Sequence, residues 1–348
     1  MPTWHRIVRQ STRARTNGEC EMRELVRAND PVLISAIEAL LDAARIPHLL
    51  LDQNMSVLEG SIGILARRIL VPEDRAREAR RLMEDAGLGH ELRADADVTE
   101  DAALDGRVRL RQPKKGHRFG HDAILLAAAT DATAGHHIVD LGAGVGAAGL
   151  ALAMRVPDVK VTLLDVDEDL VDLAEDNARL NKVGDRVRAV ALDVSASAWA
   201  FSAAGLESGA IARVMMNAPF NDPSKHQRSP LVGRAQAHVA ADDTLAVWTT
   251  TAARLLGFEG ALTLIWRADE LDDVLAALGD AAFGNIAVLP VHPRPGVPAI
   301  RILVRAVKGS LRGVSLLPGL TLNHESGKPT GEAEAVLRRG ETIRMVDR

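Results

Sequence analysis

The chain has 348 residues, of which 47% are hydrophobic and 26% charged, and its formal net charge is −5 at pH 7. This length is sufficient for two globular domains, and the acidic total argues against a protein that coats nucleic acid over its whole surface. The single cysteine, Cys20, excludes an intrachain disulfide framework and a cysteine-rich metal site. No apolar run is long enough to cross a bilayer, so we expect no membrane segment. The single cysteine fits a reducing compartment and the histidines lack metal-ligand spacing, so we expect a cytoplasmic protein without a metal.

The first segment of the chain, residues 1–21, contains arginine, serine and threonine without apolar periodicity. It lacks the apolar core of a secretory signal. We therefore expect a disordered extension here, unless translation begins at Met22.

Residues 22–88 have the pattern of a small α+β domain. Asp30 can cap a helix whose first turn holds Pro31, because a carboxylate there accepts bonds from free backbone amides. The expected elements are a strand at 23–27, this helix, strands at 48–52 and 68–71, and a helix at 73–86 that ends at Gly87. The segment at 52–60, Asp-Gln-Asn-Met-Ser-Val-Leu-Glu-Gly, resembles a short bacterial domain of signal-transducing proteins. No residue set in it looks catalytic, which favours a module that binds a ligand or a protein partner.

Residues 89–105 are acidic and rich in alanine, and we expect a linker there. From 106 to 348, strands alternate with helices. Buried parallel strands are expected at 138–141, 161–164, 187–192, 214–216 and 262–266, and antiparallel strands at 286–291 and 300–307. This order predicts a Rossmann-like α/β sheet, mostly parallel with an antiparallel last strand, whose ligands bind at the carboxyl ends of the strands.

A glycine-rich turn with Gly142, Gly144 and Gly146 follows the first of these strands. Glycine permits a tight backbone and a close approach of a ligand. The spacing also fits a dinucleotide-binding turn, so the turn alone leaves NAD and S-adenosylmethionine open.

Three aspartates lie around this turn, and two of them bear on the choice between NAD and S-adenosylmethionine. Asp165 ends the next strand, where a carboxylate accepts bonds from ribose hydroxyls in either cofactor class. Asp140 precedes the glycines and can position the turn or the methionine amine of S-adenosylmethionine. Asp193 follows the third strand and can accept a bond from the adenine amine. The last two favour S-adenosylmethionine, although each aspartate alone could be a helix cap or a loop residue.

The sequence Asn217-Ala218-Pro219-Phe220 follows an apolar strand and can hold a planar amino group. The Asn217 side chain and the Ala218 carbonyl can each accept one hydrogen of that group. Phe220 can stack on the flat ring that carries it, and the chain has only five phenylalanines and no tyrosine. The pattern therefore predicts a reaction at nitrogen; the alternative is a turn at a strand end with a core phenylalanine.

Residues 107–348 resemble the class I S-adenosylmethionine-dependent methyltransferases and, within them, the bacterial tRNA1(Val) adenine-N6 methyltransferase family. The resemblance is carried by the segment Gly-His-Arg-Phe-Gly-His-Asp-Ala-Ile-Leu-Leu-Ala at 116–127, the glycine turn, the Asn217 motif, and Pro-Ala-Ile-Arg-Ile-Leu-Val at 298–304. It implies S-adenosyl-L-methionine as cofactor and RNA, most simply tRNA, as partner. The family's motif is usually Asn-Pro-Pro-Tyr or Asn-Pro-Pro-Phe, so Ala218 departs from it, but its backbone carbonyl is retained.

The resemblance also implies roles for individual residues. Phe119 and Asp122 would fold over the methionine end of the cofactor, although Asp122 could equally be a helix N-cap. The glycines of the turn would cradle the methionine moiety, Asp165 would bind the ribose and Asp193 the adenine.

Three alternatives stay open at this point. Related motifs also serve methylation of ribosomal RNA guanine and of a protein glutamine amide. A NAD-dependent oxidoreductase is disfavoured, because nothing supplies an acid/base pair for hydride transfer. A non-catalytic cofactor-binding regulator is the third. In addition, basic stretches without acids at 107–121, 223–241 and 281–324 could converge on one phosphate-binding face or could be scattered surface charge.

Overall fold

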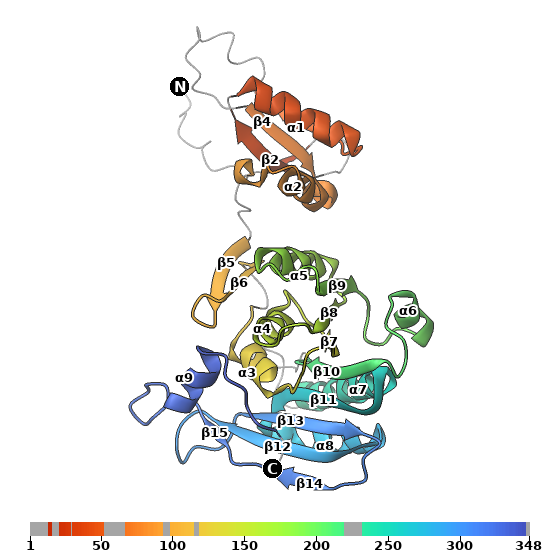
Figure 1. The fold of residues 1–348 in the computed structure, drawn as a ribbon, viewed down its shortest axis with the longest axis vertical. Coiled ribbons are helices and arrows are strands. Elements are labelled where there is room, and N and C mark those ends of the chain that lie inside the picture. The colour runs from red at the N-terminus through yellow and green to blue at the C-terminus, as the bar shows by residue number, and fades with distance from the viewer. Residues whose placement is uncertain are drawn as a thin grey trace. The chain divides into compact units, whose positions relative to one another are not determined.

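The structure, a computed structural model, describes residues 13–15, 21–28, 30–51, 67–92, 98–114, 118–218 and 232–345, with the backbone alone at 13–15, 21 and 232–243. It divides into two compact units, Met1–Ala96 and Asp97–Arg348 (Figure 1). Pro219, Phe220 and the segment at 52–60 lie outside the described residues. Each unit is treated by itself below.

The first unit is a four-stranded sheet, in the order β1-β2-β4-β3, with two helices. Its elements are β1 (Arg13–Arg15), β2 (Glu21–Ala28), α1 (Pro31–Ala43), β3 (Leu49–Leu51), β4 (Arg67–Pro72), η2 (Glu73–Arg75), α2 (Ala76–Asp85) and η3 (Gly89–Glu91). Asp30 caps α1 as expected, since its carboxylate accepts from the backbone N–H of Val32 at 2.8 Å. Apolar residues of both helices and of β2 and β4 form one buried core. The small α+β fold is confirmed.

Two parts of the chain expected to lack regular structure contain strands. Arg13–Arg15, inside the expected disordered extension, forms β1 and pairs with β2. The expected linker at 89–105 contains η3 and β5 (Val98–Ala103), which pairs with β6 (Val108–Pro113). The linker prediction was therefore wrong for the second part of that segment. Acidic and small residues conceal β5 from pattern analysis, although Ala103 of β5 and Val108 and Leu110 of β6 belong to the buried core.

The second unit has the predicted sheet, in the order β14-β12-β13-β11-β10-β7-β8-β9, with β15 paired to β12. Its strands are β7 (His137–Leu141), β8 (Lys160–Asp165), β9 (Val187–Ala191), β10 (Ile211–Met216), β11 (Leu256–Arg267), β12 (Phe283–His292), β13 (Arg301–Lys308), β14 (Val314–Leu316) and β15 (Leu320–Thr321). β7 to β11 are mutually parallel, and β13 is antiparallel to both of its neighbours. The Rossmann-like fold, mostly parallel with an antiparallel last long strand, is confirmed.

Helices cover both faces of this sheet (Figure 1). They are α3 (His121–Ala129), α4 (Ala147–Arg155), α5 (Glu168–Leu180), α6 (Ala198–Ala203), α7 (Val232–Leu255), α8 (Leu271–Asp280) and α9 (Gly331–Leu337). Residues of α3, α4, α5 and α9 share one buried core, and residues of α6, α7 and α8 share the other. Within β7, Ile138 belongs to the first core and Val139 to the second, as alternation along a strand requires.

The C-terminal part of the chain returns to the start of the second unit. The N–H of Ile343 donates to the carbonyl of Ala128 at 2.9 Å. Arg155 donates to the carbonyl of Ala127 at 2.7 Å and to the hydroxyl of Thr342 at 2.6 Å. These contacts fix α9 beside α3. Across the described ranges, no helix has the length and apolarity that a membrane crossing needs.

Candidate active site

Strand register brings the predicted acceptor and cofactor residues to one edge of the sheet. Met216 of β10 pairs with Leu141 of β7, so the residues after them, Asn217 and Gly142, leave the sheet side by side. Asp165 ends β8, on the other side of β7, at the same level. Parallel strands expose their carboxyl ends together, and this edge is where such folds bind ligands.

The glycine turn is hydrogen-bonded to Asp165, and open space lies next to the backbone of Gly144. Gly142, Gly144 and Gly146 have φ values of 66°, 56° and 86°, in the left-handed region that favours glycine. The N–H of Gly144 donates to a carboxylate oxygen of Asp165 at 2.7 Å. A Cβ built on Gly144 would meet no heavy atom of the described residues within 4 Å. The turn therefore leaves room for a ligand against its backbone.

Trp248 of α7 closes the other side of the turn. A Cβ on Gly142 would lie 2.4 Å from the Cη2 atom of the Trp248 ring. The ring therefore packs directly on the glycine Cα. The sequence analysis missed this residue, because a tryptophan in a helix pattern reads as ordinary core and its partner is over 100 positions away. Phe220, the other aromatic contact expected near the site, lies outside the described residues, as does Pro219.

Asp140 is buried beneath the turn, with only 2% of its surface exposed. Its carboxylate accepts the N–H of Gly149 in α4 at 2.9 Å. Burial, partly offset by this bond, raises the pKa of Asp140 to about 7. Of the two roles considered for Asp140, this geometry favours holding the turn and the following helix in place over contact with a methionine amine.

Asp193 and Val166 lie at the ends of β9 and β8 and are exposed. The backbone N–H of Ser195, 2.7 Å from the Asp193 carboxylate, holds the pKa of Asp193 below its usual range, and the Ser195 hydroxyl adds to the effect. The carboxylate is thus charged and open to solvent. Val166 is 67% exposed directly after Asp165. An exposed apolar side chain between two carboxylates can contact the flat face of a base, and sequence reasoning did not single it out.

Asp122 does not cap α3. The N-cap is Gly120, and Asp122 in the first helical turn forms an ion pair with Arg301 of β13 at 3.0 Å. The cap interpretation of Asp122 is therefore wrong. The pair joins the two segments at 116–127 and 298–304 that were matched separately in the sequence.

Two consecutive hydrogen bonds connect the backbone of Phe119 to the β5–β6 hairpin. Its N–H donates to the side-chain oxygen of Gln112 at 3.1 Å, and the Gln112 amide donates to Asp101 at 2.8 Å. Hydrogen bonds from Gln112, Thr99 and Arg118 outweigh desolvation and lower the pKa of Asp101. The segment ahead of α3 is thus fixed by buried and charged partners.

Asn177 of α5 joins the same hairpin to the glycine turn. Its amide donates to the carbonyls of Arg111, at 2.9 Å, and Val145, at 3.0 Å, and accepts the N–H of Arg111 at 2.7 Å. Asn181, one turn later, binds the backbone of Arg109 in the same way. The sequence signal was two asparagines four residues apart on the buried side of a helix, but their partners could not be identified from spacing.

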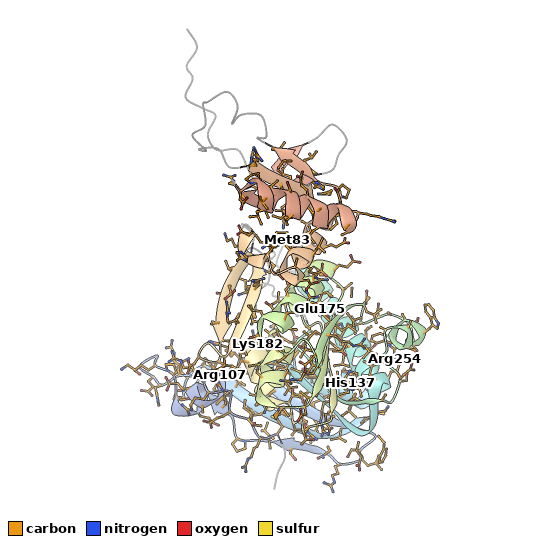
Figure 2. The ribbon with its side chains drawn as sticks, turned by 45° about the horizontal axis from the view of Figure 1, so that its top comes forward. Met83, Arg107, His137, Glu175, Lys182 and Arg254 are labelled. Carbon is orange, nitrogen blue, oxygen red and sulfur yellow. The ribbon has the colours of Figure 1, made fainter. Side chains whose placement is uncertain are left out.

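Several described cations of the basic stretches have partners within the second unit, and residues 223–231 lie outside the described residues. Ion pairs join Arg109 to Glu100, Arg118 to Asp101, Arg301 to Asp122 and Arg305 to Asp131. Arg107, whose position is labelled in Figure 2, donates to the carbonyls of Leu104 and Arg338. Lys308 donates to the carbonyl of Leu256. These cations form ion pairs and hydrogen bonds within the fold. Over the same described ranges, histidine, cysteine and acidic residues do not gather in groups of three that could hold a metal ion.

The described residues of this edge fit S-adenosylmethionine. The turn offers backbone with open space over Gly144, Asp165 lies at the next strand end, and Asp193 presents a charged carboxylate beyond it. In this arrangement the turn would hold the methionine moiety, with the ribose beside Asp165 and the adenine beside Val166 and Asp193.

Comparisons with known proteins agree with this geometry. Residues 118–266 match the model of the "Methyltransferase small domain", and residues 22–87 match that of the "Putative prokaryotic signal transducing protein" domain. A solved structure described as a predicted O-methyltransferase from Agrobacterium tumefaciens is 28% identical, covers 64% of this chain and 98% of its own, and superposes with a TM-score of 0.55.

Two curated relatives are methyltransferases of different substrates. The release factor glutamine methyltransferase of Chlorobaculum tepidum is 33% identical over 29% of this chain and 35% of its own length. The tRNA1(Val) (adenine(37)-N6)-methyltransferase of Aeromonas hydrophila is 25% identical over 55% of this chain and 77% of its own. The chain thus spans only about a third of the first relative. Residues 118–266 thus match the methyltransferase small domain model, and the second unit is similar in fold to the solved structure described as a predicted O-methyltransferase.

Proposed function

We propose that the protein transfers the methyl group of S-adenosylmethionine to the exocyclic N6 amine of an adenine in tRNA. The observation that carries the proposal is the register of β10 on β7, which sets Asn217 beside Gly142 at the open edge of the sheet. An amide oxygen and a cofactor turn are thereby adjacent, as transfer to an amino group requires.

The proposed role of the protein groups is to position and polarise the amine. S-adenosylmethionine supplies a methyl group on a positively charged sulfur, which is a good leaving group. The Asn217 side-chain oxygen and the Ala218 carbonyl accept the two amine hydrogens, which favours a pyramidal nitrogen with its lone pair exposed. Phe220 stacks on the base, which must leave its neighbours to enter the site. A strong general base is not required, because the nitrogen proton becomes acidic after transfer.

Ala218 keeps the backbone acceptor that the mechanism needs. It is buried, with 1% of its surface exposed, and it precedes Pro219, which biases it toward an extended conformation. Only the fixed φ of a proline is lost. The substitution is therefore compatible with an active site.

The tRNA substrate is supported by the relatives. Several of them are tRNA1(Val) adenine-N6 methyltransferases, and the Porphyromonas gingivalis protein is 30% identical over 45% of this chain. A tRNA substrate would place the enzyme in the cytoplasm. We also propose that the first unit, which lacks a catalytic residue set in its described part, binds a ligand or a protein partner.

A second candidate is methylation of a protein glutamine amide. It is favoured by the Chlorobaculum tepidum relative, and the chemistry is closely similar, because an amide nitrogen also carries two hydrogens in a plane. Ribosomal RNA guanine offers the same kind of exocyclic amine. The acceptor geometry serves all three substrates, so the substrate has to be identified directly.

The decisive experiment uses radiolabelled S-adenosylmethionine. The protein is incubated with total RNA, and separately with ribosomal proteins and release factors, from a strain that lacks the gene. We expect label in tRNA as N6-methyladenosine. Label confined to ribosomal RNA or to protein would replace the tRNA proposal, and tight cofactor binding without any transfer would indicate a regulator.

The Asn217→Ala variant tests the mechanism. Loss of one fixed acceptor is expected to lower kcat by about 10²–10³-fold. Cofactor affinity, measured by calorimetry, should stay within about twofold of the wild type. Transfer at the wild-type rate by this variant would rule out the proposed role of Asn217.

A further inference from the structure

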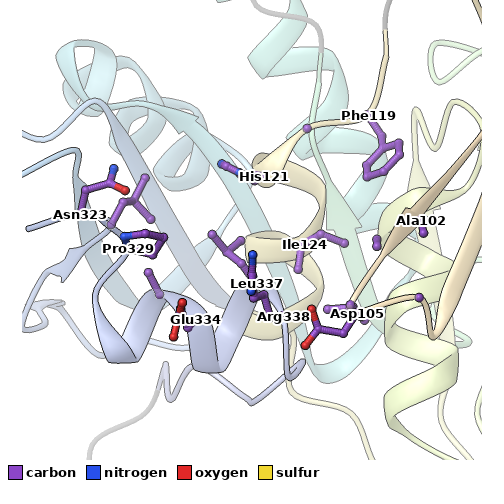
Figure 3. Close-up of a pocket in the computed structure, with 16 residues that line it drawn as sticks. Ala102, Asp105, Phe119, His121, Ile124, Asn323, Pro329, Glu334, Leu337 and Arg338 are labelled. Carbon is purple, nitrogen blue, oxygen red and sulfur yellow. The ribbon is translucent and has the colours of Figure 1, made fainter. Parts of the chain in front are cut away.

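A cavity of about 770 Å³ lies between the turn of the β5–β6 hairpin, the start of α3, and the C-terminal elements β15 and α9 (Figure 3). Its volume is in the range of small-ligand sites. The described residues around it include none from the glycine turn and neither Asn217 nor Ala218. It is therefore distinct from the glycine turn and from the acceptor motif.

The cavity and the cofactor edge share one segment. Phe119, Gly120 and His121 line the cavity, and the same segment leads directly to Asp122, the partner of Arg301. Figure 3 shows this segment at the start of α3, with the hairpin on one side and α9 on the other. A ligand in the cavity would thus contact the piece of chain that we assign to the methionine end of the cofactor.

The walls combine apolar surface with hydrogen-bond acceptors. The Phe119 ring, Ile124 and Leu337 supply flat and aliphatic surface, and Asp105 and Glu334 supply carboxylates. Asn323 donates its amide to the carbonyl of Pro293 at 3.2 Å, which leaves the side-chain oxygen as an acceptor. Among the described lining residues the charged groups are two acids and one base, Arg338. A phosphate would therefore be repelled from the interior.

We infer that this cavity binds a second nucleobase of the RNA substrate, one that carries an exocyclic amine. Bases in single-stranded RNA are recognised by stacking on aromatic rings and by hydrogen bonds to their edges. Guanine, adenine and cytosine present amino hydrogens that Glu334, Asp105 and Asn323 accept, whereas uracil has no amino group. Arg338, which also lines the cavity, would pair with a phosphate of the RNA backbone. The inference rests on the proposed function, because it takes RNA as the substrate.

Filling the cavity is the main test. Leu337→Trp places a larger ring in the space, and Leu316→Trp is the matched control, because Leu316 is 73% exposed on β14 and does not line the cavity. We expect Leu337→Trp to raise KM for RNA about tenfold, the usual range for loss of one stacked base, with kcat and cofactor affinity little changed. Leu316→Trp should leave KM unchanged. Thermal unfolding of both variants verifies that they are folded.

Base selectivity is the second measurement. The full-length protein is titrated with guanosine, adenosine, cytidine and uridine in the presence of S-adenosylhomocysteine. Glu334→Gln should weaken binding of the first three more than that of uridine, whose base donates only its ring N3–H. Equal binding of all four nucleosides, or unchanged KM in Leu337→Trp, would overturn the inference while tRNA methylation continued. Displacement of bound nucleoside by a glutamine peptide would also overturn it, in favour of a protein ligand. If the wild type methylates no RNA, the proposed function fails instead, and cavity binding is still decided by the titration.

Discussion

The polar side chains at the two ends of the second unit's sheet differ in whether they are paired within the protein. At the carboxyl ends of β7, β8 and β10, glycines have positive φ, and Asp165 and Asn217 lie beside open backbone. Below them, Asp131, which follows α3, pairs with Arg213 at 3.0 Å and with Arg305 at 3.3 Å. One end leaves acceptors for a ligand, and the other satisfies its charges internally.

This difference in pairing distinguishes polar residues that are available to bind a ligand from polar residues that stabilise the fold. Charged side chains that pair with each other away from the site contribute little to ligand binding. The following variants should therefore affect stability at both ends but cofactor binding at one end alone.

The largest expected effect is the pH dependence of Asp140. Its pKa is raised to about 7 in the folded protein, whereas a free aspartate titrates near 3.9. The folded state thus binds the proton more tightly, so the stability contributed by this group is highest below about pH 4 and is lost as the pH rises to about 7. The full difference is on the order of 4 kcal/mol.

Asp140→Asn removes this titration while keeping an oxygen for the Gly149 amide. Urea unfolding at several pH values between 4 and 8 should show a flatter profile for the variant than for the wild type. Asp185→Asn, at an exposed position, is the control and should keep the wild-type slope. Identical profiles for Asp140→Asn and the wild type would show that Asp140 is not the titrating group.

Next in size is the pair Gly142→Ala and Gly144→Ala. Both changes strain a left-handed backbone, but only the first drives a Cβ into the Trp248 ring. We expect Gly142→Ala to cost about 3 kcal/mol of unfolding free energy and Gly144→Ala about 1 kcal/mol. Gly144→Ala should still weaken cofactor binding, because its Cβ enters the open space above the turn.

A double variant isolates the Trp248 contact. Combining Gly142→Ala with Trp248→Ala should cost less than the sum of the two single changes, since the clash is then absent. Additive costs, measured by urea unfolding, would mean that the ring does not restrain the turn.

A smaller effect than that of Gly142→Ala is expected at the opposite end of the sheet. Asp131→Asn leaves Arg213 and Arg305 without their counter-charge, which should cost about 1–2 kcal/mol because Asp131 is partly exposed. Cofactor affinity and kcat should not change. A loss of cofactor affinity in this variant would abolish the distinction between the two ends.

The sequence alone determined the α/β sheet, the helix cap at Asp30 and the positions of the glycine turn and Asn217. These follow from local signals: apolar periodicity, capping side chains, and glycines after a buried strand. Even the proximity of Asn217 to the turn follows from the rule that parallel strands expose their carboxyl ends together.

Tertiary structure alone decided which side chains meet. Trp248 covers Gly142, Asn177 joins the hairpin to the turn, and Asp122 pairs with Arg301 instead of capping its helix. Each contact joins residues tens to more than a hundred positions apart, and no local periodicity encodes such a partner. The β5 strand was missed for a different reason: it pairs locally with β6 in a hairpin, but its acidic and small residues lack the apolar alternation of a typical strand.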